Sequence, residues 1–361
     1  MRAIFTLTCV VATTLVLVFQ TSAQDRLAGK KLIEWGWDEP DTRFMRENVQ
    51  KMEALPFDGL VFHAVSSKGG NLCWEMWGAR RFQVTEFQHA IDDLKATPFR
   101  RLTDRFLRVN VTPGKVDWFD DPAWQTVSDN FAVAARIAKQ GGCKGFMFDV
   151  EQYEGQLFNY AKQKHQGQKP FAEYQARVRQ RGQEWMKAVH GAYPDITILL
   201  TFGYRIAVPG DAGGDRSKTG YGLLADFLDG MLDACSDGTK LVDAWEFSYP
   251  FKKQEQFQKA YETIKVKSAA WSSAPEKYGR HVQAGFGIWM DQDWRRKGWN
   301  VSDLAKNYFT PAELETAVRA ALTVSDQYVW IYTEQPRWWT NEKLPKEYVD
   351  ALTRARQSPP H

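Results

Sequence analysis

The chain has few of the residues that usually hold a catalytic metal. Six histidines occur among 361 residues, and none of them belongs to an HxH or HExxH motif, so the ligand spacing of a zinc site is missing. Four cysteines occur without CxxC spacing. The three beyond the N-terminal apolar run would allow one disulfide but are better explained as buried thiols. No glycine-rich phosphate loop follows an apolar run, and we therefore expect neither a metal nor any other cofactor.

Charge of one sign and long apolar runs are also scarce. The formal net charge is +3, and Lys and Arg are scattered rather than clustered, which argues against a nucleic-acid partner. One long apolar run extends from Ala3 to Phe19, after Arg2 and before Thr21-Ser22-Ala23. This pattern predicts a secretory signal peptide over residues 1–23. An uncleaved N-terminal anchor is the alternative, and it is disfavoured because the run is at the short end for a membrane span. We expect a secreted or periplasmic monomer that has no membrane contact after cleavage.

Strand-like runs recur along residues 24–361 and alternate with segments of helical spacing. The eight runs are Lys31–Trp37, Asp58–Val65, Phe106–Val111, Gly145–Glu151, Thr197–Gly203, Leu241–Tyr249, His281–Met290 and Gln327–Glu334. One helix is expected to open with the capping box Thr310-Pro311-Ala312-Glu313. Strict alternation predicts a parallel sheet. Eight repeats predict a (β/α)8 TIM barrel, an α/β fold that makes residues 24–361 a single catalytic domain.

The connections of this barrel differ in length at its two ends. Helix-to-strand connections are short, such as residues 56–57 and 140–144, whereas strand-to-helix connections are long, such as residues 66–84 and 291–309. In a parallel barrel the long connections gather on the face where the strands have their carboxyl ends, and catalytic sites are built there. We expect the functional site on that face.

The run that begins at Gly145 ends abruptly in carboxylates. With a period of two, Asp149 and Glu151 share one face of the expected strand, and Phe148 and Val150 share the other. Paired carboxyl groups are what glycoside hydrolysis requires, because one must stay protonated to donate to the leaving oxygen while the other is ionised. We predict Glu151 as the general acid, with the charge of Asp149 raising its pKa.

Other strand-like runs also end near acids. Glu246 and Glu334 belong to the ends of the sixth and eighth runs, and either is predicted to serve as nucleophile, base or electrostatic partner of Glu151. Glu34 and Asp291 lie near the ends of the first and seventh runs and are predicted to bind substrate. An inward position is expected for Glu34 and Glu334. For each acid alone, the competing explanation is that it caps the next helix or pairs with an arginine.

Tryptophan is abundant, with fifteen residues in the chain. The apolar faces of sugar rings pack well on indoles, while sugar hydroxyls bond acids, amides and phenols. Trp185 and Trp245 are expected in the core, whereas tryptophans of the long loops are expected at the site. The predicted substrate contacts are Glu34, Trp37, Trp74, Trp77, Asn110, Tyr153, Tyr249, Trp289, Asp291 and Trp338.

The apolar N-terminus, the eightfold alternation and the strand-end acids together resemble a secreted (β/α)8-barrel glycoside hydrolase. Asp149-Val150-Glu151 is similar to the last part of the family-18 chitinase motif, which implies that the Glu is the acid and that the Asp assists an acetamido group on the substrate. The two earlier acids of that motif are missing, since Lys144 to Met147 supply none. Phe148-Asp-Val-Glu-Gln-Tyr153 resembles the Phe-x-Ile-Glu-Pro-Tyr stretch of endo-α-mannosidase-like barrels, with Gln152 in place of Pro. Both resemblances imply a catalytic role for Glu151, and neither identifies the sugar.

Three functions fit these patterns. The leading prediction is an extracytoplasmic glycoside hydrolase that cleaves a polysaccharide or glycan. The alternative is a barrel that binds carbohydrate without cleaving it, and the discriminating quantity is the carboxylate separation, which catalysis keeps at about 5 to 9.5 Å. A third is a different hydrolase on the same scaffold. A serine nucleophile would need a Gly-x-Ser-x-Gly elbow, which the sequence lacks.

Overall fold

The structure is a computed structural model, and it describes residues 27–210, 213–293 and 298–357. The predicted signal peptide lies outside these residues. Within the three described ranges, no helix combines the length and the apolar character that crossing a membrane requires.

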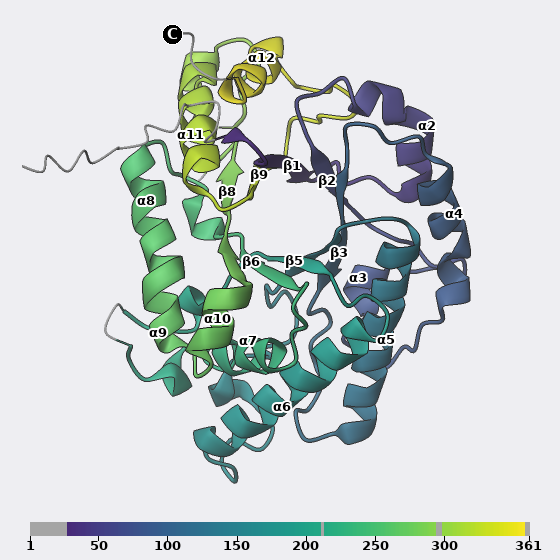
Figure 1. The fold of residues 1–361 in the computed structure, drawn as a ribbon, viewed down its shortest axis with the longest axis vertical. Helices are drawn as coiled ribbons and strands as arrows, with labels where there is room; N and C mark the ends of the chain where they lie inside the picture. Colours follow the sequence, from purple (N-terminus) through teal and green to yellow (C-terminus); the bar gives the residue numbers. More distant parts are fainter. Residues whose placement is uncertain (1–26, 211–212, 294–297, 358–361) are drawn as a thin grey trace, which may run out of the picture.

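Nine parallel strands form one sheet that curves into a barrel (Figure 1). They are β1 Lys31–Gly36, β2 Gly59–Phe62, β3 Asp104–Asn110, β4 Gly145–Asp149, β5 Thr197–Leu200, β6 Lys240–Asp243, β7 Val282–Ala284, β8 Phe286–Trp289 and β9 Tyr328–Thr333. Strands β7 and β8 are two halves of one predicted strand, because β7 pairs with β6, β8 pairs with β9, and Gly285 alone separates them. A Cβ atom on Gly285 would lie 3.0 Å from the carbonyl oxygen of Tyr328, so glycine permits the close approach at this break. The eight predicted strands and the (β/α)8 fold are confirmed.

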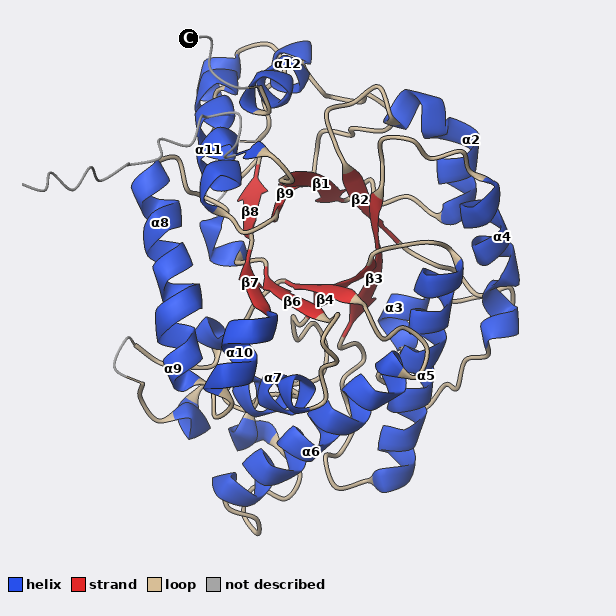
Figure 2. Cartoon of the chain, viewed as in Figure 1, coloured by secondary structure: helices blue, strands red, loops and turns tan. Residues whose placement is uncertain are grey.

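Helices surround the barrel on its outer side (Figure 2). The α-helices are α2 Thr42–Met52, α3 Leu72–Glu75, α4 Gln88–Ala96, α5 Asp121–Gln140, α6 Phe171–His190, α7 Leu224–Asp233, α8 Gln254–Glu262, α9 Ala269–Trp271, α10 Pro275–His281, α11 Pro311–Val324 and α12 Lys346–Ala355. Short 3-10 turns cover Val84–Phe87, Tyr160–Lys162, Tyr204–Ile206, Arg216–Lys218, Glu246–Ser248 and Leu304–Lys306, and a π-helical turn covers Thr263–Ser268. The predicted capping box opens α11, where the Glu313 carboxylate accepts the Thr310 N–H at 2.9 Å.

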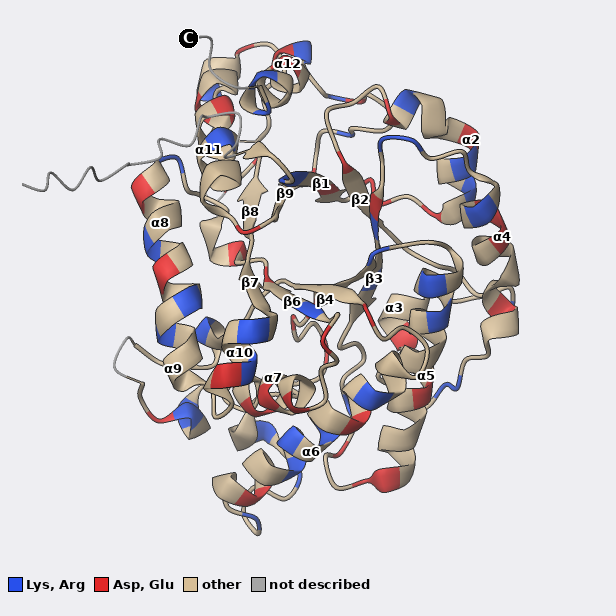
Figure 3. Cartoon of the chain, viewed as in Figure 1, with Lys and Arg blue, Asp and Glu red and all other residues tan. Residues whose placement is uncertain are grey.

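Alternation along the strands divides the apolar core into two layers. Ile33, Met147 and Trp330 belong to the layer inside the barrel, whereas Leu32 and Phe148 belong to the layer between strands and helices. Basic and acidic residues are interspersed over the outer helices (Figure 3). Because side chains fill the barrel, its interior is a core and not a pore. In a barrel of this kind the site is built above the core, at the mouth made by the carboxyl ends of the strands.

Candidate active site

Asp149 and Glu151 lie at the mouth of the barrel, where β4 ends. Met147 packs inside the barrel, and the period of two therefore directs both acids toward the interior side. Asp149 is fully buried and accepts the backbone N–H of Glu151 at 3.1 Å. The guanidinium of Arg108, from the neighbouring strand β3, donates to Asp149 Oδ2 at 3.1 Å. The acid pair thus has one cation at its side.

Tyr153, in the loop after β4, bridges the two carboxyl groups. Its hydroxyl oxygen lies 2.9 Å from Asp149 Oδ2 and 2.5 Å from Glu151 Oε2. Burial raises the pKa of Glu151, and the charge of Asp149 raises it further. Burial also raises the pKa of Asp149, and Arg108 opposes that effect. The pair therefore holds protons more tightly than exposed carboxyl groups do.

Glu246 reaches the mouth from the turn after β6. Trp245, just before it, has a φ of +39° in the left-handed region, which a residue other than glycine occupies at a cost of about 1–3 kcal/mol. The Glu246 N–H donates to the carbonyl oxygen of Thr201 at 3.1 Å, which helps to hold this turn. Burial raises the pKa of Glu246 well above its usual range, and Glu151 and Asp149 raise it further.

Asp149, Glu151 and Glu246, called the mouth trio below, interact electrostatically at the mouth of the barrel, and burial raises the pKa of each of them. The charge of Asp149 raises the pKa of Glu151, and both raise the pKa of Glu246. Groups coupled in this way lose their protons one at a time and not independently. The trio therefore keeps a carboxylic acid beside a carboxylate over a wider pH range than exposed acids would, and that pairing is what general acid catalysis needs.

Glu334 follows β9 and accepts the Tyr332 hydroxyl at 3.3 Å. Burial and the charge of Asp291 raise its pKa. Asp291 itself is buried and accepts the backbone N–H groups of Glu334 and the next residue, at 3.1 and 2.8 Å. Asp291 therefore anchors the loop that follows β9. Of the two predicted partners of Glu151, Glu246 is the one that the fold couples to it electrostatically.

Four large apolar side chains at the mouth are exposed to solvent. Trp37 is 65% exposed, Trp74 39%, Tyr153 49% and Phe247 42%. They lie in the segments after β1, β2, β4 and β6. Exposed rings cost free energy in water, and several of them around one mouth are typical of a surface that binds an amphipathic ligand such as a sugar.

A second aromatic group lies on the β8–β9 side of the mouth. Tyr249 stacks on Tyr332 with 5.5 Å between ring centroids, and Trp289 packs edge-on against Tyr249 at 5.8 Å. The indole N–H of Trp37 donates to the Tyr332 hydroxyl at 2.9 Å. The predicted contacts Trp37, Tyr249 and Trp289 are thus joined through Tyr332.

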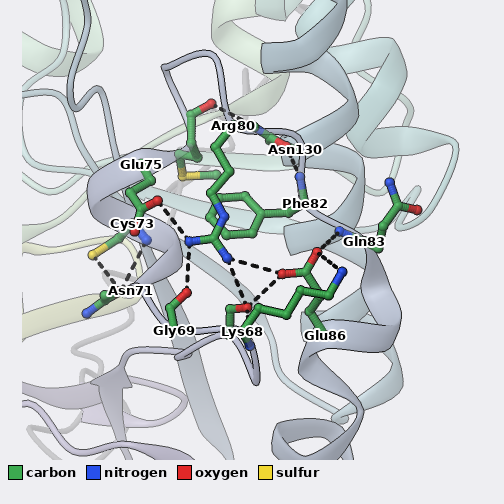
Figure 4. Close-up of polar contacts among 12 residues, drawn as sticks. Lys68, Gly69, Asn71, Cys73, Glu75, Arg80, Phe82, Gln83, Glu86 and Asn130 are labelled. Atoms are coloured by element: carbon green, nitrogen blue, oxygen red, sulfur yellow. Dashed lines mark hydrogen bonds and ion pairs between the residues drawn. The ribbon is translucent and has the colours of Figure 1, made fainter.

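The segment that carries Trp74 is held by Arg80 (Figure 4). One guanidinium nitrogen of Arg80 donates to Glu75 at 2.9 Å, and the other donates to Glu86 at 3.2 Å. Asn130, on α5, donates to the carbonyl oxygen of Arg80 at 2.9 Å. The ring of Trp74, on α3, is therefore presented on an ordered segment, which lowers the entropy cost of binding a ligand there.

Two predicted substrate contacts lie in the core instead. Trp77 is fully buried and packs edge-on against Trp124 with 5.4 Å between centroids. Trp338 is 1% exposed and packs edge-on against Phe57 at 5.0 Å. Both indoles turn away from the mouth and fill the layer between strands and helices, so neither is available to a sugar.

Glu34 also departs from its expected position. It alternates with Ile33 and Trp35, which pack inside the barrel, and it therefore faces the helix layer on the outer side of β1. It is fully buried, so the inward placement and the substrate contact do not hold. Asn110 is fully buried on β3, opposite Asp149 in the strand register.

Sequence reasoning missed Arg108 and Glu39. The guanidinium of Arg108 lies 3.5 Å from Glu39 Oε2. Glu39 also accepts the indole N–H of Trp35 at 2.9 Å and lies 3.3 Å from His63 Nδ1. The available signal was the alternation of β3: Arg108 shares the face of Phe106, which packs inside the barrel, and a charge on that face needs a partner.

No cluster of three or more His, Cys, Asp and Glu side chains suited to a metal ion occurs in the part of the chain that the structure describes. Cys73 and Cys143 are buried free thiols, and Cys235 is a partly buried one. Burial raises the pKa of Cys143 to about 11 and that of Cys235 to about 12. These thiols are therefore poor nucleophiles near neutral pH.

Comparisons with known proteins bear on the fold. No protein-family model and no curated protein matches the chain. A trimodular GH5_4 subfamily endoglucanase matches with a TM-score of 0.50 and 10% identity, over 94% of this chain and 62% of that one. A GH5-4 broad specificity endoglucanase from an uncultured bacterium has a TM-score of 0.48 and 10% identity, over 93% of this chain and 96% of that one. A glycoside hydrolase family 5 enzyme from Prevotella bryantii B14, in complex with a xyloglucan tetradecasaccharide, has a TM-score of 0.47 and 11% identity, over 93% and 99%.

At these identities the likeness concerns the fold. The chain is a single-domain (β/α)8 barrel, as the strand order already indicates. A barrel of this kind supports many unrelated chemistries, so function has to be argued from the mouth residues. The local resemblances to family-18 chitinases and to endo-α-mannosidase-like barrels stay predictions.

Proposed function

We propose that the protein is an extracytoplasmic glycoside hydrolase that cleaves a polysaccharide or glycan with a pair of carboxyl groups. The observation that carries the proposal is the mouth trio, in which burial and neighbouring charge raise the pKa values of Glu151 and Glu246. The exposed rings of Trp37 and Trp74 at the same mouth support a saccharide substrate. The predicted signal peptide supports a location outside the cytoplasm.

In this proposal Glu151 is the general acid. Its proton passes to the glycosidic oxygen while the bond from that oxygen to the anomeric carbon breaks, and the bonding electron pair leaves on the oxygen. Glu246, in its ionised form, either bonds to the anomeric carbon or takes a proton from the attacking water. Burial and the charges of Glu151 and Asp149 raise the pKa of Glu246, and the Tyr249 hydroxyl opposes that rise, so Glu246 is ionised in the state of the trio in which Glu151 holds the proton. Water completes hydrolysis, and Glu151 regains its proton.

Asp149 has a supporting role. Its carboxylate is fully buried and accepts from Arg108 and from the Glu151 N–H, so it is already engaged on two sides. Its charge beside Glu151 disfavours a second negative charge there. We propose that it keeps the acid protonated and does not itself attack the sugar.

The first test is hydrolysis of a panel of polysaccharides by the mature protein, followed as reducing ends over time. Release by the wild type, together with a loss of about 10²–10⁴ in rate for Glu151→Gln, supports the proposal. If the wild type cleaves nothing and a glycan of the panel raises its melting temperature, the protein is a carbohydrate-binding barrel, and the proposal fails.

A second test separates the roles of the two glutamates. On an aryl glycoside of the cleaved sugar with a dinitrophenolate leaving group, departure needs little protonation. Glu151→Gln should therefore recover most of its lost rate on that substrate, whereas Glu246→Gln should not. The reverse pattern would exchange the two assignments.

A further inference from the structure

Arg108 is enclosed by the mouth of the barrel on several sides. Its guanidinium lies 3.1 Å from Asp149 Oδ2 and 3.5 Å from Glu39 Oε2. It also lies over the rings of Trp35 and Trp74, at 5.4 and 4.9 Å from their centroids. Only 16% of the side chain is exposed. A cation with so little contact with water depends on both carboxylates for compensation.

The two contacts of the Tyr153 hydroxyl with carboxyl groups determine how many protons Tyr153, Asp149 and Glu151 hold together. Its hydroxyl oxygen has a carboxyl oxygen on each side, at 2.9 Å from Asp149 and 2.5 Å from Glu151. Two oxygen–oxygen contacts this short each need a proton between them. Burial and the two neighbouring carboxyl groups raise the pKa of Tyr153, so the phenol keeps its proton and supplies one of the two. The second proton has to sit on one of the two carboxyl groups.

The surroundings of the two carboxyl groups differ. Asp149 accepts from Arg108 at 3.1 Å and from the Glu151 N–H at 3.1 Å, and both contacts favour its ionised form. The Glu151 carboxyl group, in contrast, contacts the Tyr153 hydroxyl and lies beside the charge of Asp149. The order of donation is therefore from Glu151 to Tyr153 and from Tyr153 to Asp149.

We propose that Arg108, held between Glu39 and Asp149, is a positioning residue that keeps Asp149 ionised and leaves the shared proton on Glu151. Glu39 limits this effect, because its negative charge offsets part of the electrostatic field that Arg108 exerts on Asp149. Its own place is fixed by the indole N–H of Trp35 at 2.9 Å. As an account of catalysis this inference rests on the proposed function, but the position of the proton does not depend on any substrate.

The titratable and charged groups around Arg108 come from five elements or segments. Those that act on Arg108 itself are Glu39 after β1, Cys73 on α3, and Asp149, Glu151 and Tyr153 at and after β4, while His63 after β2 contacts Glu39, and Glu246 and Tyr249 after β6 interact with the acid pair. Of these, Glu39 and Asp149 are the two carboxylates in ion-pair contact with the guanidinium. Removing the positive charge of Arg108 should raise the proton affinity of the Asp149–Glu151 pair, whereas removing the negative charge of Glu39 should lower it.

The test is a pH titration of the side-chain carboxyl carbons of the mature protein by NMR with ¹³C-labelled Glu and Asp, without substrate. The Glu151 signal is assigned by its loss in Glu151→Gln. Arg108→Met removes a positive charge and should raise the proton affinity of the Asp149–Glu151 pair about tenfold or more. Glu39→Gln leaves Arg108 less compensated and should lower that affinity by a similar factor.

Two further variants keep the outcome interpretable. Arg108→Lys keeps a cation and should shift the titration less than Arg108→Met, and it serves if the latter does not fold. Arg81→Met removes an exposed arginine that pairs with Asp129 and should leave the titration unchanged. Shifts of Arg108→Met and Glu39→Gln in the same direction, or none in either, would overturn the inference. Opposite shifts in a protein that cleaves no glycan would support it while the proposed function fails.

Discussion

The barrel contains two acid pairs near strand ends, Asp149 with Glu151 and Glu34 with Asp38, in each of which one acid is fully buried, and Glu34 does not face the mouth. Asp149 and Glu151 follow Met147 on the inner side of β4, beside Arg108 and Tyr153. On β1, Glu34 faces the helix layer. It is fully buried, and burial together with the nearby Asp38 raises its pKa well above its usual range. Among the described residues, no Lys or Arg forms an ion pair with the carboxyl group of Glu34.

The two acid pairs differ in the face of the strand from which they project, and this face changes with every residue along a strand. An odd step along a strand moves a side chain from the mouth to the helix layer. At the mouth, an acid with a raised pKa can exchange its proton with a ligand. Glu34, between the strands and the helices, is fully buried, so its raised pKa acts on stability. A raised pKa alone therefore does not identify a catalytic residue, and the direction of the side chain decides.

The largest contrast is expected between Glu246 and Glu334. Glu246→Gln should lower kcat by about 10³-fold or more, because the carboxylate that acts at the anomeric carbon is lost. Glu334→Gln should cost at most about tenfold, the scale of a lost substrate contact. Initial rates of reducing-end release from the cleaved polysaccharide measure both. Equal losses in the two variants would contradict the assignment of Glu246, and not Glu334, as the carboxylate that acts together with Glu151.

Trp74 and Trp77, both in the connection after β2, show the same contrast between an exposed side chain at the mouth and a side chain buried between the strands and the helices. Trp77→Ala should lower the free energy of unfolding by about 3–5 kcal/mol, because a fully buried indole leaves a cavity. Trp74→Ala, which truncates an exposed ring, should change it by about 0.5 kcal/mol or less. Urea denaturation followed by circular dichroism compares the two. Similar losses would contradict the assignment of Trp77 to the core.

The raised pKa of Glu34 should make the free energy of unfolding depend on pH. With a raised pKa, the folded protein keeps a proton that the unfolded chain loses above about pH 4.3. The free energy of unfolding should then fall by about 1.4 kcal/mol per pH unit through that window, until the pH passes the folded-state pKa. Glu34→Gln removes this term, so its stability relative to the wild type should rise with pH.

Glu53 provides a matched control for that experiment. It accepts the backbone N–H groups of Arg100, Arg101 and Leu102, and its pKa is lowered, with these backbone hydrogen bonds outweighing the opposing effect of burial. A lowered pKa stabilises the fold above the unfolded pKa and is lost as pH falls. The stability of Glu53→Gln relative to the wild type should therefore fall as pH rises. If the stabilities of Glu34→Gln and Glu53→Gln relative to the wild type changed in the same direction with pH, the opposite pKa shifts assigned to Glu34 and Glu53 would be wrong.

The smallest effect is expected at the exposed platform. Trp74→Ala should raise KM about three- to tenfold, which corresponds to about 0.7–1.4 kcal/mol for one stacked ring, while kcat changes little. Steady-state kinetics over a range of polysaccharide concentrations give both constants. A loss confined to kcat would mean that Trp74 acts through Arg108 and Tyr153 and not as a binding surface.

Much of the fold was predictable because its signals are local. The β–α alternation gave eight strands, and Gly285 only divided one of them. The alternation within β4 separated Asp149 and Glu151 from Phe148 correctly. On β1 it failed, because Ile33 and Trp35 are apolar like Leu32, and a strand buried on both faces does not reveal which side is interior.

The rest of the mouth depends on contacts distant in sequence. Arg108 and Glu39 meet across 69 residues of chain, since β1 and β3 lie on either side of β2. The choice between Glu246 and Glu334 depends on the turn at Trp245, whose left-handed backbone no local motif announces. Whether an indole in a long loop points outward, as in Trp74, or inward, as in Trp77, is likewise set by packing with α5.

The most direct test of the account compares the two acid positions in one assay. Reducing-end release from the cleaved polysaccharide is followed for the wild type, Glu151→Gln and Glu34→Gln at equal concentrations of folded protein. We expect Glu34→Gln to stay within about twofold of the wild type, whereas Glu151→Gln loses about 10²–10⁴ in rate. Wild-type rates for Glu151→Gln, or an equal loss in Glu34→Gln, would contradict the claim that the mouth trio carries the chemistry.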